Sequence, residues 1–183
     1  MRTLLLPGWQ NSGPDHWQSH WERELGFERV EQSDWQWPRR GDWMARLDDM
    51  LLASPSSVVL VAHSLGCQLV ASWAAHSQHT AKVHCALLVA VPDTERADMP
   101  PQLHNWRPIT RQALPFRGAM LFSNDDPYCE RERALWMAQQ WGIQATDIGP
   151  HGHVNTESKL GSWPQALRYL QGLGQMSETM PIW

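Results

Sequence analysis

One stretch of the chain, SVVLVAHSLGCQLVAS at positions 57–72, constrains the fold more than any other part of the sequence. The apolar run Val58–Ala62 has the composition of a buried strand, and it stops abruptly at His63–Gly66. Apolar side chains then return at helical spacing, so the pattern predicts a strand, a sharp turn at Ser64 and a helix. A buried strand that leads directly into a helix is the repeating unit of α/β proteins.

The residues around Ser64 have the form of a nucleophile elbow. Ala62 and Gly66, two positions before and after the serine, are small, as a strand that turns straight into a helix requires. The usual pattern is G-x-S-x-G, and alanine at its first position keeps the small volume but loses the freedom to adopt positive φ. If a base reaches the Ser64 hydroxyl, the serine can attack a carbonyl, and the amide N–H of Leu65 can stabilise the oxyanion. The alternative is an ordinary buried turn before a helix.

Strand and helix patterns alternate along the rest of the chain, which predicts an α/β fold with a mostly parallel sheet of about six strands and helices on both faces. With 183 residues, we expect one domain over residues 1–172 and a C-terminal tail over 173–183. The predicted strands are Arg2–Leu6, Phe27–Gln32, Val58–Ala62, Val83–Val91, Gly118–Ser123 and Gln144–Ile148. The predicted helices are Trp17–Leu25, a segment from an N-cap at Asp42 to Leu51, the segment after Ser64, Glu130–Trp141 and Leu160–Leu170.

The longest irregular segment is Pro92–Pro115, which contains five prolines and no clear period. Loops of this length in compact domains are often functional, so we interpret it as a short cap over the site, with only a minimal lid. Most of the twelve tryptophans are expected in the core. Trp106 in this segment and Trp35 in an earlier loop are candidates for the wall of a substrate pocket.

Acidic residues and histidines directly follow the last two predicted strands. The carboxyl ends of parallel strands meet at one edge of the sheet, so an acid and a histidine are expected beside Ser64. The chain order of serine, acid and histidine is that of α/β-hydrolases. The candidates are the acids Asp125 and Asp126 and the histidines His151 and His153.

The choice among these candidates is not settled by local sequence. Asp126 precedes Pro127, which favours an extended backbone at position 126 and helps to fix the side chain's direction. An aspartate before proline can also be the N-cap of the following helix. Asp93, at the end of the preceding strand, is a third candidate acid. His151 and His153 flank a flexible glycine, and local chemistry does not separate them.

The loop after the first strand is the expected source of a second oxyanion donor, and the Trp9 amide, after Gly8, is the candidate. The alternative is that Gly8 only makes a tight turn. His16 and His20 have the four-residue spacing of a metal pair, but no Glu follows His16 and no third ligand is evident. We therefore expect no metal and no organic cofactor.

Four segments together resemble the small serine-hydrolase family that includes retinoblastoma-binding protein 9 and its bacterial relatives: LLLPGWQNSGPDHWQSHW, VAHSLGC, SNDDPY and GHVNTES. The resemblance spans nearly the whole chain. It implies a compact α/β-hydrolase fold, a Ser-His-Asp triad of Ser64, His153 and Asp126, and hydrolysis of esters or amides. The retinoblastoma-binding LxCxE sequence has no counterpart here, so that partner is not carried over.

Composition excludes several other classes of function. The formal net charge is −4 and no basic stripe is present, which argues against a nucleic-acid partner. The three cysteines form no CxxC pair, as in a reducing compartment. The apolar run Leu4–Leu6 is too short for a signal peptide or a membrane span, so we expect a cytoplasmic protein.

The sequence thus predicts a serine hydrolase that cleaves a small ester, thioester or amide through an acyl-enzyme intermediate. Ser64 is the expected nucleophile, His153 the base, and Asp126 the residue that orients and stabilises the imidazole. Two alternatives stay open: a non-catalytic binding or scaffold protein on the same fold, and an acyltransferase. The sequence does not identify the natural substrate, a protein partner or the oligomeric state.

Overall fold

The computed structural model describes residues 1–175, and six strands in them form one sheet of order β2-β1-β3-β4-β5-β6. All five neighbouring pairs are parallel, so every connection must return from the carboxyl end of one strand to the amino end of the next. The strands are β1 (Arg2–Leu6), β2 (Glu28–Arg29), β3 (Val58–His63), β4 (Val83–Val89), β5 (Arg117–Phe122) and β6 (Gln144–Asp147).

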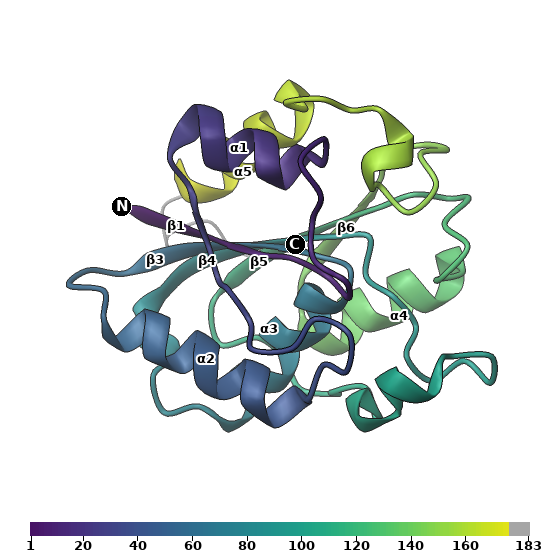
Figure 1. Cartoon of the computed structure of the whole chain (residues 1–183), viewed down its shortest axis with the longest axis horizontal. Coiled ribbons are helices and arrows are strands. Elements are labelled where there is room, and N and C mark those ends of the chain that lie inside the picture. The colour runs from purple at the N-terminus through teal and green to yellow at the C-terminus, as the bar shows by residue number, and fades with distance from the viewer. Residues whose placement is uncertain (176–183) are drawn as a thin grey trace.

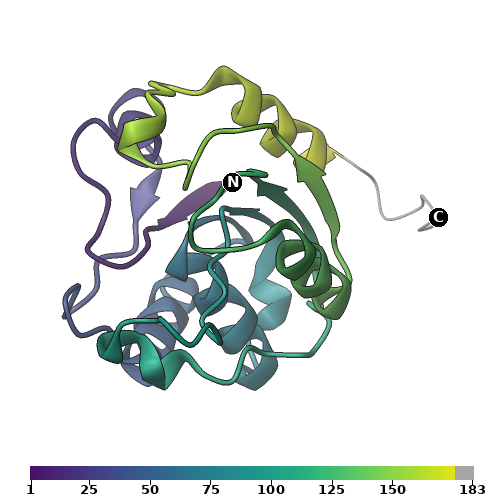
Figure 2. The same ribbon diagram turned by 90° about the vertical axis from the view of Figure 1, so that its right-hand side faces the viewer.

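Helices cover both faces of this sheet (Figures 1 and 2). One face carries α1 (Trp17–Leu25) and α5 (Pro164–Gln175), and the other carries α2 (Arg40–Leu52), α3 (Leu65–His76) and α4 (Arg131–Trp141). Three short 3-10 helices complete the described elements: η1 (Thr80–Lys82), η2 (Pro101–Trp106) and η3 (Thr156–Ser158). The predicted α/β fold with a parallel six-stranded sheet is confirmed.

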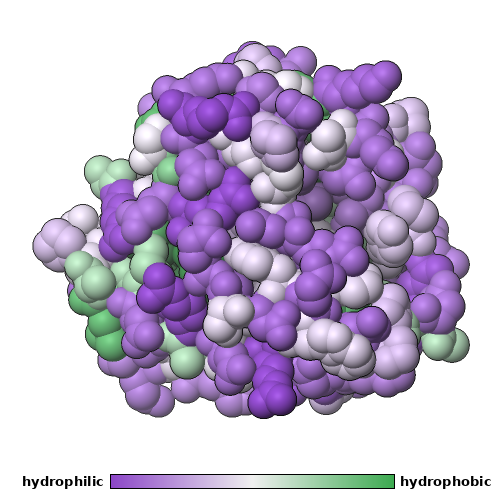
Figure 3. Space-filling view, viewed as in Figure 1, coloured by the Kyte–Doolittle hydropathy of each residue, from purple (hydrophilic) through white to green (hydrophobic). Residues whose placement is uncertain are grey.

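The core is divided by the sheet into two hydrophobic clusters. Side chains alternate across a strand, so Leu4 and Leu60 pack toward α2 and α3, whereas Leu5 and Val61 pack toward α1 and α5. Both faces of β3 and β4 are therefore covered, which explains their continuous apolar sequences. The face of the molecule seen in Figure 1 is mainly hydrophilic, with small hydrophobic areas toward its left edge (Figure 3). No helix within residues 1–175 is long and apolar enough to cross a membrane.

Two helices begin at residues that differ clearly from the prediction. Helix α2 begins at Arg40, so Asp42 lies in its first turn and is not the N-cap. The Arg40 amide instead donates to Asn105 Oδ1 at 2.8 Å, a cap that comes from a distant segment. Helix α5 begins at Pro164 because a turn with positive φ at Lys159 and Gly161 precedes it.

The same helix continues through Gln175, past the expected end of the domain at residue 172. Residues 173–175, which were assigned to a tail, are thus part of α5. The remainder of that tail, residues 176–183, lies outside the described residues.

Trp106 belongs to the core and does not line a pocket, so that interpretation is wrong. Its indole is 1% exposed, its Nε1 donates to the Pro38 carbonyl at 2.8 Å, and its ring meets Trp43 edge-on at 5.3 Å. The indole fills the space between η2 and α2. Among residues 1–175, six tryptophans are fully buried in this way, which accounts for much of the unusual composition.

Candidate active site

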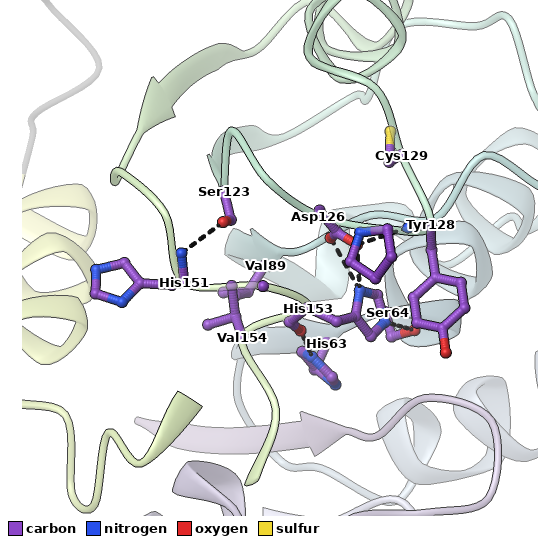
Figure 4. Close-up of polar contacts among 12 residues, drawn as sticks. His63, Ser64, Val89, Ser123, Asp126, Tyr128, Cys129, His151, His153 and Val154 are labelled. Atoms are coloured by element: carbon purple, nitrogen blue, oxygen red, sulfur yellow. Dashed lines mark hydrogen bonds and ion pairs between the residues drawn. The ribbon is translucent and has the colours of Figure 1, made fainter. Parts of the chain in front are cut away.

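Three polar side chains from separate loops meet at the carboxyl edge of the sheet (Figure 4). Ser64 lies between β3 and α3, Asp126 follows β5, and His153 follows β6. The His153 Nε2 lies 2.7 Å from Ser64 Oγ, and its Nδ1 lies 2.9 Å from each carboxylate oxygen of Asp126. Because the carboxylate accepts at Nδ1, that nitrogen carries the proton, and Nε2 is left to accept from the serine hydroxyl.

The backbone at Ser64 adopts φ 53° and ψ −124°, a conformation that non-glycine residues rarely occupy. The Ser64 amide donates to the Val89 carbonyl at 2.9 Å, and this bond joins the turn to β4. Ala62 lies within the extended strand β3, so a positive φ is needed at the serine and not at position 62. This explains why alanine is acceptable where the usual pattern has glycine.

Two glycines make room for the turn. A Cβ at Gly66 would lie 2.2 Å from the Leu6 carbonyl oxygen, so α3 can pack against the end of β1 only if this position has no side chain. A Cβ at Gly8 would lie 2.6 Å from Ser64 Cβ. The loop after β1 therefore passes directly beside the serine.

The three candidate acids have three different surroundings. The Asp126 side chain, 3% exposed, reaches His153 and also accepts from the Tyr128 amide at 2.9 Å. It is not the N-cap of α4, because that helix begins at Arg131 with Glu130 as its cap. The structural role of Asp126, besides its contact with His153, is therefore to stabilise the turn before α4 and not to cap that helix.

The other two acids contact different partners. Asp125 accepts from the Ser123 hydroxyl at 2.6 Å and from the Gly152 amide at 2.7 Å, so it supports the loop that carries the histidines. Asp93 pairs with Arg133 at 2.7 Å. Of the three acids, Asp126 is the one that contacts His153.

The two histidines of the loop point in opposite directions (Figure 4). The His153 ring packs between Ser64 and Asp126. The Tyr128 ring meets it edge-on, with the ring centres 4.6 Å apart. The His151 side chain points away from Ser64, and its backbone amide donates to Ser123 Oγ at 2.8 Å. The structure thereby separates two residues that local sequence could not.

The two amides considered as oxyanion donors both lie next to Ser64. Leu65 is the first residue of α3, where helix geometry leaves the N–H without an intrahelical partner. Trp9 follows Gly8, which abuts the serine. Within residues 1–175, neither of these two amides donates a hydrogen bond to a backbone carbonyl in a turn, loop or cap. The Gly8 carbonyl also accepts from Asn11 at 3.1 Å, so the tight turn foreseen as an alternative is present as well.

Trp35, the other candidate for a pocket wall, is half-buried and belongs to a loop that rests against the loop after β1. Its carbonyl accepts from the Gln10 amide at 3.1 Å, and its ring meets Trp43 edge-on at 5.3 Å. Trp9 Nε1 donates to the Gln36 carbonyl at 3.0 Å. These contacts place Trp35 beside the chain segment that carries Trp9.

His63 was missed in the sequence as a member of the site. It is 5% exposed, and its Nε2 donates to the His153 carbonyl at 2.9 Å. Burial, with smaller contributions from His16 and His153, lowers the pKa of His63 well below its ordinary value, so the ring is neutral. Its only sequence signal is its position immediately before Ser64.

The two histidines with metal-like spacing have other partners. His16 Nδ1 accepts from the Gln18 amide at 3.1 Å and caps α1, whereas His20 pairs with Glu24 at 3.1 Å. Burial, followed by the nearby Arg29 charge, lowers the pKa of His16 to about 3. Across residues 1–175, no group of three or more His, Cys, Asp or Glu side chains is arranged to hold a metal ion.

Comparison with known proteins points to hydrolases. A family model described as serine hydrolase matches residues 3–172. The structure is similar to that of a YdeN-like hydrolase from Pectobacterium atrosepticum, with 27% identity and a TM-score of 0.84 over 95% of this chain and 90% of that chain. It is also similar to the ydeN gene product of B. subtilis, with 21% identity and a TM-score of 0.76 over 96% and 99% of the two chains. A monoacylglycerol lipase from Paleococcus ferrophilus has 10% identity and a TM-score of 0.72 over 96% and 94%. Comparison with curated proteins gives no match.

Proposed function

Because the chain belongs to the serine hydrolase family, we propose that Ser64, His153 and Asp126 form a catalytic triad that hydrolyses a small ester, thioester or amide. One observation carries this proposal. The His153 ring contacts the Ser64 hydroxyl through Nε2 and the Asp126 carboxylate through Nδ1. That is the arrangement in which a serine is activated by a base whose tautomer is fixed by an acid.

The first half of the reaction forms an acyl-enzyme. His153 Nε2 takes the hydroxyl proton while Ser64 Oγ attacks the substrate's carbonyl carbon, and the carbonyl oxygen becomes an oxyanion. The amides of Leu65 and Trp9 donate to this oxygen, and Asp126 stabilises the imidazolium. The oxyanion then re-forms the carbonyl, the bond to the leaving group breaks, and His153 returns the proton to that group.

The second half releases the acid. His153 Nε2 takes a proton from water, whose oxygen attacks the acyl carbon and generates a second oxyanion at the same place. Collapse of this intermediate breaks the bond to Ser64 Oγ, which recovers its proton from His153. The products are a carboxylic acid and the alcohol, thiol or amine released earlier.

The test compares Ser64→Ala with wild type, using a fluorophosphonate probe and a short-chain nitrophenyl ester. Ser64→Ala should lose the covalent adduct, although binding and the oxyanion donors can leave a turnover about 10³-fold over water. The mutant should stay folded, because alanine fits a turn built for small side chains. Labelling at the wild-type rate would show that Ser64 is not the nucleophile.

His153→Ala and His151→Ala form a matched pair for the base, since both residues lie in one loop. We expect His153→Ala to abolish ester turnover and His151→Ala to lower it only modestly, because the His151 ring points away from Ser64. The reverse ranking would transfer the role of base to His151. If well-folded wild-type protein neither reacts with the probe nor turns over esters, a binding or scaffold function is favoured instead.

The acyl acceptor and the location of the protein are separate proposals. We take water as the acceptor, and added alcohols or amines that divert the product would instead identify an acyltransferase. Cys67, Cys85 and Cys129 are all free, buried thiols, which supports a reducing, cytoplasmic location.

A further inference from the structure

In the loop that carries His153, the backbone has a positive φ on both sides of that residue. Gly152 has φ 56° and Val154 has φ 51°. A positive φ is unusual for a β-branched residue such as valine, and Val154 is fully buried. Such a conformation persists only where surrounding contacts enforce it.

Two buried N–H groups hold the end of this loop. His63 Nε2 donates to the His153 carbonyl, and Trp17 Nε1 donates to the Val154 carbonyl, each at 2.9 Å. The donors support one another, because the Trp17 ring meets His63 edge-on with the ring centres 6.0 Å apart. The His63 ring also packs against the ring of His153 itself, with the ring centres 5.2 Å apart.

The earlier part of the loop has its own supports. Ser123 Oγ accepts from the His151 amide and Asp125 accepts from the Gly152 amide. Neither bond acts at or beyond the His153 carbonyl. The Val154 amide, beyond His153, also donates to the His151 carbonyl at 3.2 Å. The direction of the chain at His153 therefore depends on this turn and on the bonds from His63 and Trp17.

We propose that His63 is a positioning residue, whose Nε2–H holds the backbone of His153 so that the imidazole lies between Ser64 and Asp126. This inference rests on the proposed function of these three residues. It assigns the residue before Ser64 a role that is distinct from the turn itself: the strand that presents the nucleophile also fixes the base.

The experiment compares three substitutions at position 63. Glutamine can place an amide N–H near the position of Nε2, methionine has a similar volume but no donor, and the asparagine amide is one methylene too short. His63→Gln should retain kcat to within a few-fold. His63→Met and His63→Asn should lower kcat by about 10- to 100-fold with KM nearly unchanged, since a misplacement of about 1 Å can have that effect.

A spectroscopic measurement separates positioning from general stability. The proton NMR signal of the His153 Nδ1–H bonded to Asp126 should persist in His63→Gln and broaden or shift in His63→Met. Circular dichroism identifies any variant that does not fold, and His63→Asn then replaces it. Equal loss of kcat in all three variants, or wild-type kcat in His63→Met, would overturn the inference.

The outcomes also distinguish this inference from the proposed function. If Ser64→Ala and His153→Ala abolish labelling while His63→Met labels at the wild-type rate, only the positioning role fails. If Ser64→Ala still labels, the proposed function fails, whatever the His63 variants show.

Discussion

At the scale of single residues, neighbouring side chains of the same type have different tasks. Asp125 and Asp126 are adjacent, but the first accepts hydrogen bonds from Ser123 and the loop amide of Gly152, and the second contacts His153. In the proposed triad the second aspartate acts through its negative charge, whereas we expect an uncharged acceptor to be sufficient at the first position.

Replacement by asparagine should therefore affect the two positions differently. Asp126→Asn loses the negative charge that stabilises the imidazolium and presents an amide that favours the wrong tautomer, so kcat should fall by about 10²- to 10⁴-fold. Its melting temperature should change little, since the asparagine oxygen can still accept from the Tyr128 amide.

Asp125→Asn is the control for this prediction, and its kcat should be close to wild type because the amide oxygen can accept from Gly152. Steady-state kinetics and thermal unfolding of both variants provide the measurement. Wild-type turnover in Asp126→Asn would leave that residue with a purely structural role, and Asp93→Asn would be assayed next.

At the scale of elements, the site depends on how closely α3 approaches β1. The helix can begin directly after Ser64 only because Gly66 lies against the Leu6 carbonyl. The same approach positions the first amides of α3 next to the loop that carries Trp9. The packing of α3 and the position of the proposed oxyanion donors thus depend on one contact.

Gly66→Ala tests this contact. The added methyl group would lie 2.2 Å from a backbone oxygen that cannot move without distorting β1. We expect a loss of about 3 kcal/mol or more in the free energy of unfolding, at or above the upper range for overpacking, measured by urea denaturation.

Gly41→Ala is the matched control, because Gly41 lies in α2 and an added Cβ would contact nothing within 4 Å. Gly41 is the second residue of α2, where helix propensity counts less than in the interior, so alanine should raise the stability of that variant by at most about 0.5 kcal/mol. Similar stabilities for the two variants would contradict the close packing of α3 on β1.

The elements with the clearest sequence signals were those buried on both faces. The apolar runs of β3 and β4 led to strands close to the observed ones, and with the helices they predicted an α/β fold with a parallel sheet. The family resemblance implied the α/β-hydrolase fold, which the related structures confirm. The predicted helix boundaries were wrong where a residue distant in the sequence determines the end of the helix. Asn105 caps α2 across the fold, and no local window contains that information.

The order of the predicted strands limited the candidate acids and histidines to a few residues. It did not show which histidine contacts Ser64 and which acid contacts that histidine. Asp126 and His153 were selected over Asp125 and His151 from the family resemblance, because side-chain direction in a loop depends on contacts across the fold. The burial of a side chain could not be predicted from the sequence of an irregular segment, because such a segment has no periodic pattern. Trp106 was therefore assigned to a pocket, although its side chain is buried in the core. His63 carried no periodic signal that pointed to the carbonyl it contacts.

At the scale of the whole molecule, two buried neutral histidines link stability to pH. The pKa of His16 is lowered to about 3 and that of His63 lies well below its ordinary value, mainly through burial. An unfolded histidine has a pKa near 6.5, so below that pH the unfolded chain binds protons that the folded chain does not. The two histidines therefore contribute fully to the free energy of unfolding above about pH 6.5, and this contribution is lost as the pH falls.

Between pH 6 and 5, each of these histidines should lower the free energy of unfolding by up to about 1.4 kcal/mol per pH unit, while most carboxylates stay ionised in both states. His16→Asn keeps an N-cap acceptor but does not titrate, so its slope should be shallower by that amount. Urea denaturation at several pH values measures the slope. An unchanged slope in both His16→Asn and His63→Gln would mean that neither ring is held neutral by the fold.

The parallel sheet described above also determines how the chain must assemble. Parallel neighbours cannot be joined by a tight hairpin, so each of the five strand pairs closes a long loop before it gains any contact. Ser64 and His153 are 89 residues apart, and they meet at the edge of a sheet to which β3, β4, β5 and β6 all contribute. Before the sheet is complete, the apolar runs of β3 and β4 lack their native cover, so we expect folding of this protein to compete with aggregation, and more severely as its concentration rises.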